Sequence, residues 1–145
     1  DGTEMHVPAY IQKGYVRGLD DIGDTYIEID MTEQKMYYYA AGELELETDI
    51  VTGNTGRRMG TPQGINYIHG KQRNQILRGA DYESFVKYWV PVVGNIGIHD
   101  ASWRGIFGGQ IYQTGGSHGC INTPTANMSQ LYEMVEVGMP VIMFY

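Results

Sequence analysis

The sequence predicts a mainly β fold, a β-sandwich of largely antiparallel or mixed sheets with one main α-helix. Glycine and tyrosine are abundant, with 20 and 12 copies in 145 residues, and this composition is typical of many strands joined by tight turns. Apolar and polar residues alternate in the first half, and only the segment after residue 122 has clear helical spacing. The length and the 42% hydrophobic content indicate one domain with a substantial core.

The first half of the chain is expected to form an antiparallel meander followed by shorter strands. In its third strand, Leu44, Leu46 and Ile50 alternate with acidic residues, so these three are expected to face the core. Turns rich in glycine, threonine and proline separate the later strands. The strands predicted in this half are 26–30, 35–40, 44–50, 65–68 and 75–78.

The second half is expected to carry the functional groups. Residues 80–95 crowd aromatic side chains without a consistent period, and we interpret them as a long loop, a flap beside the site. Residues 97–100 indicate a strand end that places His99 at the rim of a sheet. A helix is predicted next, capped by Thr123 with Pro124 in its first position, and the chain closes with a strand at 141–145.

The composition of the chain indicates where the folded domain begins and which partners are excluded. Residues 1–21 have no periodicity and are interpreted as a tail, or the remnant of a linker to an upstream domain, which leaves 22–145 as the folded domain. The net charge of −7 divides into −9 over residues 1–50, +4 over 51–110 and −2 over 111–145. This balance predicts no basic surface large enough for nucleic acid.

The run Ser117–Asn122, with the sequence SHGCIN, contains the single cysteine of the chain. A lone cysteine is often a small buried hydrophobe. Here Gly119 allows the backbone to approach a reacting carbonyl closely, and histidines occur at positions 99 and 118. Because a thiol titrates near ~8.5 and reacts as the thiolate, an adjacent imidazole would make Cys120 a nucleophile.

The residues alone leave the partners of this nucleophile open. His99 and His118 are both candidate bases, and either the carboxylate or the carbonyl of Asp100 could orient His99. The backbone N–H groups of Gly119 and Cys120 are expected donors to an oxyanion.

These residues resemble the signature of the L,D-transpeptidase (YkuD-like) catalytic domain, in which the SHGCIN run follows His99 after seventeen intervening residues. The resemblance covers residues 24–145. Asn122 stands where many members have arginine, so the chain is most similar to enzymes of Gram-positive bacteria such as enterococci and clostridia. Further matching segments are Thr52-Gly53, Thr61-Pro62-Gln63-Gly64, Gly97-Ile98-His99-Asp100 and Gly138-Met139-Pro140-Val141.

The resemblance implies a cysteine-dependent peptidoglycan L,D-transpeptidase. Cys120 would release D-Ala from a donor tetrapeptide stem and form a thioester, and a side-chain amine of a neighbouring stem would complete a 3→3 cross-link. His99 would be the base, oriented by the backbone carbonyl of Asp100. His118 and Gly119 would help Cys120 to shape the oxyanion hole.

The resemblance also implies how substrate and inhibitors are held. Ser117 and Asn122 would hold the catalytic turn together. From the residues themselves, Tyr88, Trp89 and Trp103 are expected in the substrate groove, and a position in the core is the alternative for the two tryptophans. Carbapenem β-lactams would acylate the cysteine, and no metal or organic cofactor is implied. The domain would face the cell wall outside the cytoplasm, with its targeting or anchoring segment absent from this chain.

Other functions for the same residues are less well supported. A metal site would need the cramped His-x-Cys spacing and further carboxylates or sulfur. Sortase-type chemistry needs an arginine after the cysteine, whereas the last 41 residues contain no Arg or Lys. Papain-like enzymes place cysteine before histidine. A non-catalytic peptidoglycan-binding module, or an L,D-carboxypeptidase or exchange enzyme, stays as the alternative.

Overall fold

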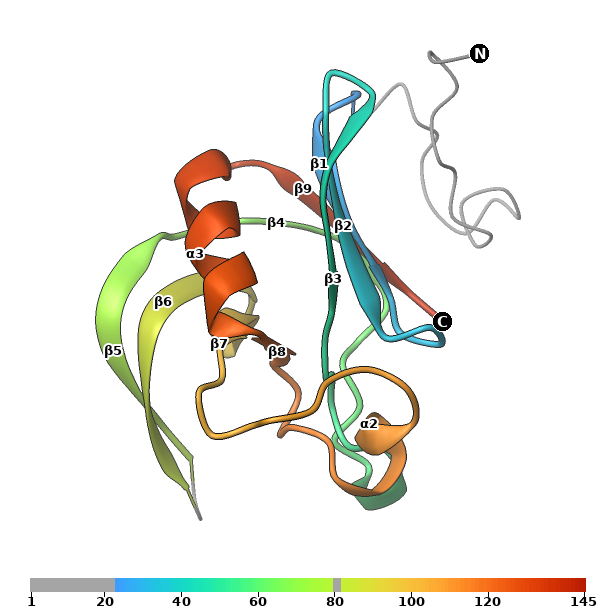
Figure 1. The fold of residues 1–145 in the computed structure, drawn as a ribbon, viewed down its shortest axis with the longest axis vertical. Helices are drawn as coiled ribbons and strands as arrows, with labels where there is room; N and C mark the ends of the chain where they lie inside the picture. Colours follow the sequence, from blue (N-terminus) through green and yellow to red (C-terminus); the bar gives the residue numbers. More distant parts are fainter. Residues whose placement is uncertain (1–22, 80–81) are drawn as a thin grey trace.

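The computed structural model describes residues 23–79 and 82–145, and it has the predicted architecture of two β-sheets with one main helix (Figure 1). The larger sheet has the strand order β3-β2-β1-β9-β4, and the smaller has the order β5-β6-β7-β8. The elements are β1 (Tyr26–Asp30), β2 (Lys35–Ala40), β3 (Glu43–Asp49), η2 (Thr55–Arg57), β4 (Gly64–Tyr67), β5 (Gln72–Arg78), β6 (Glu83–Val93), β7 (Ile96–Asp100), α2 (Ile111–Thr114), β8 (Ile121–Thr123), α3 (Thr125–Met134) and β9 (Pro140–Phe144).

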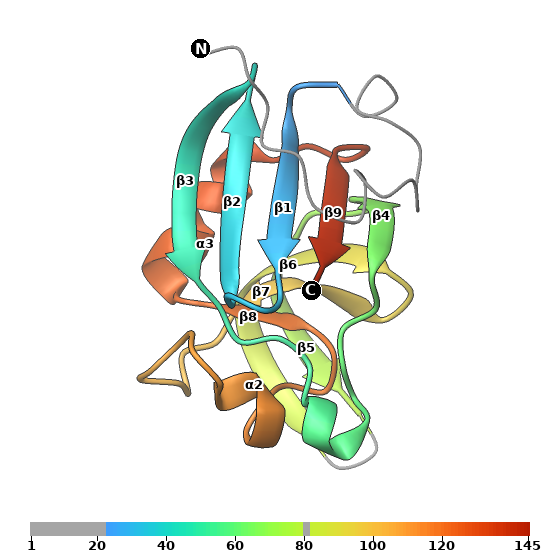
Figure 2. The ribbon, with the colours of Figure 1, turned by 90° about the vertical axis from the view of Figure 1, so that its right-hand side faces the viewer.

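The five-stranded sheet contains the predicted meander of β1, β2 and β3, and β9 pairs parallel to β1 (Figure 2). The expectation for one residue of β3 is wrong: Leu46 and Ile50 are buried, but Leu44 is 48% exposed. A bulge between Tyr38 and Tyr39 shifts the register of β2 and β3, so that Leu44 pairs with Tyr39. A shift of one residue moves a side chain to the other face of the sheet, which explains the exposure of Leu44.

The predicted loop at 80–95 is wrong for most of its length, because residues 83–93 form the long strand β6. This strand pairs with β5 on one side and β7 on the other, so it lies inside the four-stranded sheet. Pro91 lies where the register of β6 and β7 shifts before Val93. A bulge tolerates the missing N–H of proline.

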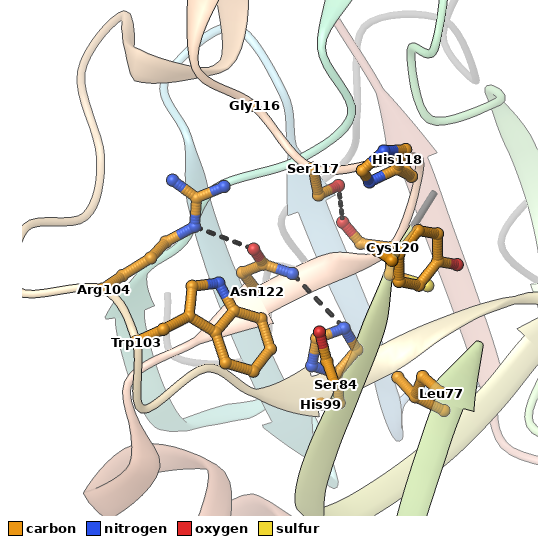
Figure 3. Close-up of a pocket in the computed structure, with 11 residues that line it drawn as sticks. Leu77, Ser84, His99, Trp103, Arg104, Gly116, Ser117, His118, Cys120 and Asn122 are labelled. Carbon is orange, nitrogen blue, oxygen red and sulfur yellow. Dashed lines mark hydrogen bonds between the residues drawn. The ribbon is translucent and has the colours of Figure 1, made fainter. Parts of the chain in front are cut away.

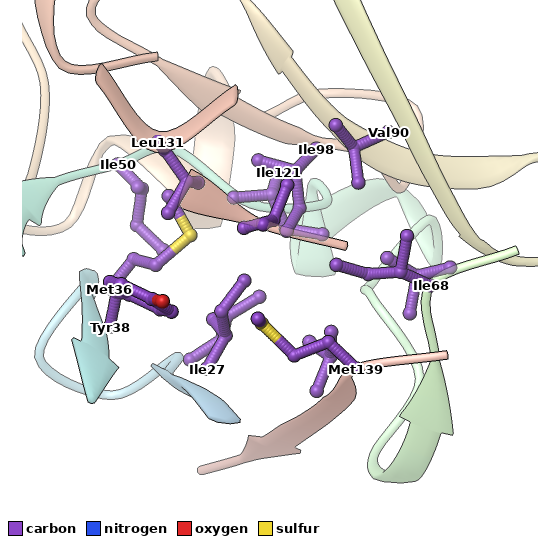
Figure 4. Close-up of a cluster of buried hydrophobic side chains, with 14 of the residues drawn as sticks. Ile27, Met36, Tyr38, Ile50, Ile68, Val90, Ile98, Ile121, Leu131 and Met139 are labelled. Atoms are coloured by element: carbon purple, nitrogen blue, oxygen red, sulfur yellow. The ribbon is translucent and has the colours of Figure 1, made fainter. Parts of the chain in front are cut away.

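Both sheets and helix α3 contribute to one hydrophobic core (Figure 4). Ile27 of β1, Ile98 of β7 and Leu131 of α3 are fully buried in it. Each side chain of this size stabilises the fold by about 1.5–3 kcal/mol when it leaves water. The core therefore joins the two sheets into one folded unit.

The predicted helix is confirmed as α3, and its residues Met128 and Leu131 are fully buried. The predicted cap is wrong, because Thr123 is the last residue of β8 and Pro124 occupies the N-cap position. A residue before proline is restricted to extended conformations, which keeps Thr123 in the strand. The predicted tail, residues 1–21, lies outside the described residues.

The parallel pairing of β7 with β8 positions the functional segment. Its register places His99 opposite Asn122 and Ile98 opposite Ile121. Cys120 directly precedes β8, so it shares a face of this strand pair with Asn122 and with His99. Within the described residues, no helix has both the length and the apolar character needed to cross a membrane.

Candidate active site

A pocket of about 260 Å³ lies over the ends of β7 and β8 and brings together residues that are distant in sequence (Figure 3). A second cavity of about 450 Å³ shares Leu77, Tyr82 and Cys120 with the first and is also lined by β5, β6 and the turn at Gly94-Asn95. Cys120 borders both. The lining of the first pocket is Leu77, Tyr82, Ser84, His99, Trp103, Arg104, Gly116, Ser117, His118, Cys120 and Asn122.

His99 is held in a single orientation by the strand that carries it. It is 3% exposed, and its Nδ1 lies 2.7 Å from the backbone carbonyl of Asp100. A carbonyl can only accept, so Nδ1 carries the proton and Nε2 keeps the lone pair that a general base needs. The rings of Trp89 and Trp103 each lie 5.9 Å from the imidazole, and burial lowers the pKa of His99.

Asp100 uses its two kinds of oxygen for different purposes. Its carbonyl accepts from His99, as the resemblance implied, whereas its carboxylate accepts from the backbone N–H groups of Lys87 and Tyr88 at 2.9 Å. Asp100 is the last residue of β7. Its side chain therefore provides hydrogen-bond acceptors for the part of β6 that extends past the end of β7. The carboxylate is therefore a structural group that does not contact His99.

The Cys120 thiol is partly buried and neutral in character. Its Sγ donates to the backbone carbonyl of Asn95 at 3.6 Å. Burial raises the pKa of Cys120, and a backbone hydrogen bond with Gly97 opposes this shift. Burial thus favours the neutral form of both Cys120 and His99.

The described residues show no hydrogen bond between Cys120 and His99, although both line the same pocket. The thiol faces Asn95, and Nε2 of His99 lies 3.3 Å from the Asn122 side-chain amide. Catalytic hydrogen bonds are often long or poorly aligned before substrate binds, so the absence of this bond does not exclude the pair as catalytic partners.

The turn before Cys120 is fixed by hydroxyl groups. Ser117 Oγ donates to the Cys120 carbonyl at 2.5 Å and accepts from the Gly119 N–H at 3.0 Å. Thr61 Oγ1 donates to the Gly119 carbonyl at 2.6 Å and accepts from the N–H of Gly53 at 3.0 Å. Gly119 has a φ of +126°, a conformation that other residues rarely adopt.

This arrangement corrects the predicted oxyanion hole. The Gly119 N–H is occupied by Ser117 Oγ, so it does not point at a substrate oxygen. Of the two predicted donors, only the Cys120 N–H makes no hydrogen bond to another described residue. It lies next to the sulfur, where the oxyanion of a thiol adduct forms. Gly119 instead acts through the shape of the turn.

His118 lies on the far side of Cys120 from His99 in Figure 3 and stacks on Tyr82 with ring centroids 4.4 Å apart. It is an exposed residue of the pocket rim, in contrast to the buried His99. Across residues 23–79 and 82–145, no group of three or more His, Cys, Asp or Glu side chains is arranged to hold a metal ion.

The predicted groove aromatics divide between the two faces of the sheet. Trp89 pairs directly with His99 and borders the second cavity, and Trp103 lines the first pocket with half of its surface exposed. The expectation for Tyr88 is wrong, because its ring lies 5.1 Å from Tyr132 of α3 on the opposite face. Neighbouring residues of a strand point to opposite sides, which separates Tyr88 from Trp89.

Sequence reasoning missed two residues that the fold brings to the site. Arg104 Nε donates to Asn122 Oδ1 at 2.8 Å, so Asn122 is contacted by both Arg104 and His99. Thr61 holds the catalytic turn from a loop almost sixty residues earlier in the chain. Thr61 lies in a matched motif that was noted without a role, whereas Arg104 carries no local signal.

Comparison with known proteins agrees with this geometry. The family of L,D-transpeptidase catalytic domains (YkuD) matches residues 24–143. The crystal structure of a mutant Enterococcus faecium L,D-transpeptidase shares 46% identity and a TM-score of 0.81, covering 85% of this chain and 50% of that one. The chain thus spans about half the length of that enzyme. No curated protein matches at a significant level.

Two further structures extend the comparison. The NMR structure of the E. faecium catalytic domain acylated by ertapenem shares 46% identity and a TM-score of 0.75, covering 83% of this chain and 97% of that one. An L,D-transpeptidase from Mycobacterium tuberculosis has 20% identity and a TM-score of 0.75, covering 84% of this chain and 58% of that one, which shows the shared fold. The site geometry, the family match and the 46% identity together place the chain in the YkuD family of L,D-transpeptidase catalytic domains.

Proposed function

We propose that this domain is a cysteine-dependent peptidoglycan L,D-transpeptidase that forms 3→3 cross-links. The observation that carries the proposal is the position of Cys120, which shares a face with His99 and borders both cavities. A transpeptidase must admit an acyl donor and then an amine acceptor to the same sulfur. Two cavities that meet at one thiol suit this requirement.

In the first half-reaction, His99 Nε2 takes the thiol proton as Cys120 Sγ bonds to the carbonyl carbon of the third stem residue. The Cys120 N–H stabilises the resulting oxyanion. The bond from that carbon to the D-Ala nitrogen then breaks, and His99 returns the proton to the departing amine. A thioester and free D-Ala result.

In the second half-reaction, the side-chain amine of another stem attacks the thioester carbon. His99 removes a proton from this amine, the carbon–sulfur bond breaks, and the sulfur recovers a proton from His99. A new amide bond joins the third residues of two stems. Water or a free D-amino acid in place of the amine would give carboxypeptidase or exchange activity at the same site.

We extend the proposal to inhibitors and location. Acylation by carbapenems is supported by the 46% identity to the E. faecium domain whose structure is acylated by ertapenem. The proposed substrate is a cell-wall polymer, so we propose that the domain works outside the cytoplasmic membrane.

The test is incubation of the protein with a defined disaccharide-tetrapeptide, followed by mass spectrometry of the products. We expect free D-Ala and a dimer lacking one D-Ala, and neither with Cys120→Ala. A monomer shortened by one residue would support the carboxypeptidase alternative. Binding of the stem without any product or any ertapenem adduct would show a non-catalytic binding module.

A further inference from the structure

Arg104 is a cation of the first pocket that the reaction above does not use. It lies in the loop after β7, is partly buried, and lines the pocket together with His99 and Cys120. None of the ion pairs among the described residues includes Arg104. Its pKa is lowered by burial. Removing a guanidinium from water without a counter-charge is unfavourable, and an anionic ligand would offset this cost.

Asn122 connects this cation to the catalytic base. Arg104 Nε lies 2.8 Å from Asn122 Oδ1, and Asn122 Nδ2 lies 3.3 Å from His99 Nε2. Figure 3 shows Asn122 between the imidazole and the guanidinium. Only Nε of Arg104 is used in this contact, so its two terminal nitrogens keep their donors for a ligand.

The chemistry of the donor stem identifies that ligand. During the first half-reaction His99 must reach the nitrogen of the departing D-Ala. The carbon atom bonded to this nitrogen also bears a carboxylate. A ligand whose amine contacts His99 therefore carries a negative charge a short distance farther on, and Arg104 is the cation beyond Asn122.

We propose that Arg104 binds the α-carboxylate of the D-Ala residue that leaves the donor stem, an inference that rests on the proposed function. The planar guanidinium suits a carboxylate because it donates two parallel hydrogen bonds. Arg104 then selects stems that end at the fourth residue. A stem extended by one residue, or ending in a carboxamide, lacks the anion at this position.

The test compares D-Ala release from a synthetic tetrapeptide stem with alaninamide release from the matching C-terminal carboxamide. A charge-assisted contact predicts that the wild type prefers the free carboxylate by roughly 10- to 100-fold in kcat/KM. Arg104→Gln should lose most of this preference, because its rate should fall much more on the free carboxylate than on the carboxamide. Arg104→Lys keeps the charge but lacks the planar guanidinium, so its preference for the free carboxylate should lie between those of the wild type and Arg104→Gln.

Arg57→Gln is the matched control, because Arg57 is exposed and lines neither cavity. It should keep the full preference of the wild type. A second measurement uses binding alone, in the Cys120→Ala background, where no turnover occurs. The Kd of the free-carboxylate stem should be lower than that of the carboxamide stem. Arg104→Lys or Arg104→Gln should reduce this difference in Kd.

Two results would overturn the inference. Equal loss on both stems in Arg104→Gln would show that Arg104 only positions Asn122, and equal rates on both stems in the wild type would show that no cation reads the carboxylate. Failure of the proposed function looks different, since the wild type would then release neither D-Ala nor alaninamide and form no ertapenem adduct.

Discussion

Strands β1 and β7 each have five residues and bury nearly all of them, yet the ionisable groups that they bury have different surroundings. Glu28 of β1 is fully buried and lines neither cavity, and burial raises its pKa to about 8. His99 of β7 is buried as deeply, but it lines a pocket beside the only cysteine. The cost of burying Glu28 reduces the stability of the fold, whereas the burial of His99 favours the neutral imidazole that the proposed general base requires.

The largest expected effect separates the two histidines of the site. His99→Ala should lower kcat/KM for D-Ala release by about 10²- to 10⁴-fold, because it removes the general base. His118→Ala should cost less than about tenfold, because His118 is an exposed rim residue stacked on Tyr82. Steady-state kinetics would measure both. Equal losses, or a greater loss at His118, would contradict the assignment of His99 as the base.

The next prediction tests whether a core substitution in β1 affects only stability, whereas one in β7 affects both stability and activity. Ile27→Ala in β1 and Ile98→Ala in β7 both empty a fully buried site and should lower the free energy of unfolding by about 2–5 kcal/mol. Denaturant unfolding would measure this. Among folded molecules, Ile27→Ala should keep kcat/KM within about twofold, whereas Ile98→Ala, next to His99, should lower it further. Equal kcat/KM values in the two variants would contradict this difference between β1 and β7.

A smaller effect is expected in the framework of the catalytic turn. Thr61→Val removes the hydroxyl shared by Gly53 and Gly119, and it should cost about 1–3 kcal/mol of stability and lower the acylation rate. Thr48→Val is the matched control, because its buried hydroxyl bonds to the Asp49 carbonyl and to Asn127 of α3, and Thr48 lines neither cavity. Mass spectrometry after ertapenem exposure would measure the acylation rate. A wild-type acylation rate in Thr61→Val would show that Thr61 does not position the catalytic turn.

The smallest effect concerns Glu28 and pH. Its pKa is about 8 in the folded protein and 4.5 ordinarily, so folding favours the protonated form. Stability from this group is full below pH 4.5 and declines as the pH rises toward 8. Glu28→Gln should flatten this slope in thermal unfolding between pH 5 and 8. A slope unchanged by the substitution would show that Glu28 is not its source.

Sequence reasoning succeeded where the signal is local. The meander, the strand ending at Asp100 and helix α3 follow short-range periodicity, and the structure confirms them. It failed for β6, because Pro91 and crowded aromatics obscured a strand whose neighbours lie on both sides. The misplacement of Leu44 has a similar cause, since a bulge depends on the partner strand.

The chain by itself determined the family and predicted the nucleophile with two candidate bases, because the SHGCIN run and the preceding histidine are contiguous or regularly spaced. Only the tertiary structure decided which groups meet. The parallel pairing of β7 with β8 brings His99 and Cys120 to one face, and folding brings Thr61 and Arg104 from distant loops. Hydrogen bonds across such separations form only after the chain has buried its core, so no local pattern encodes them.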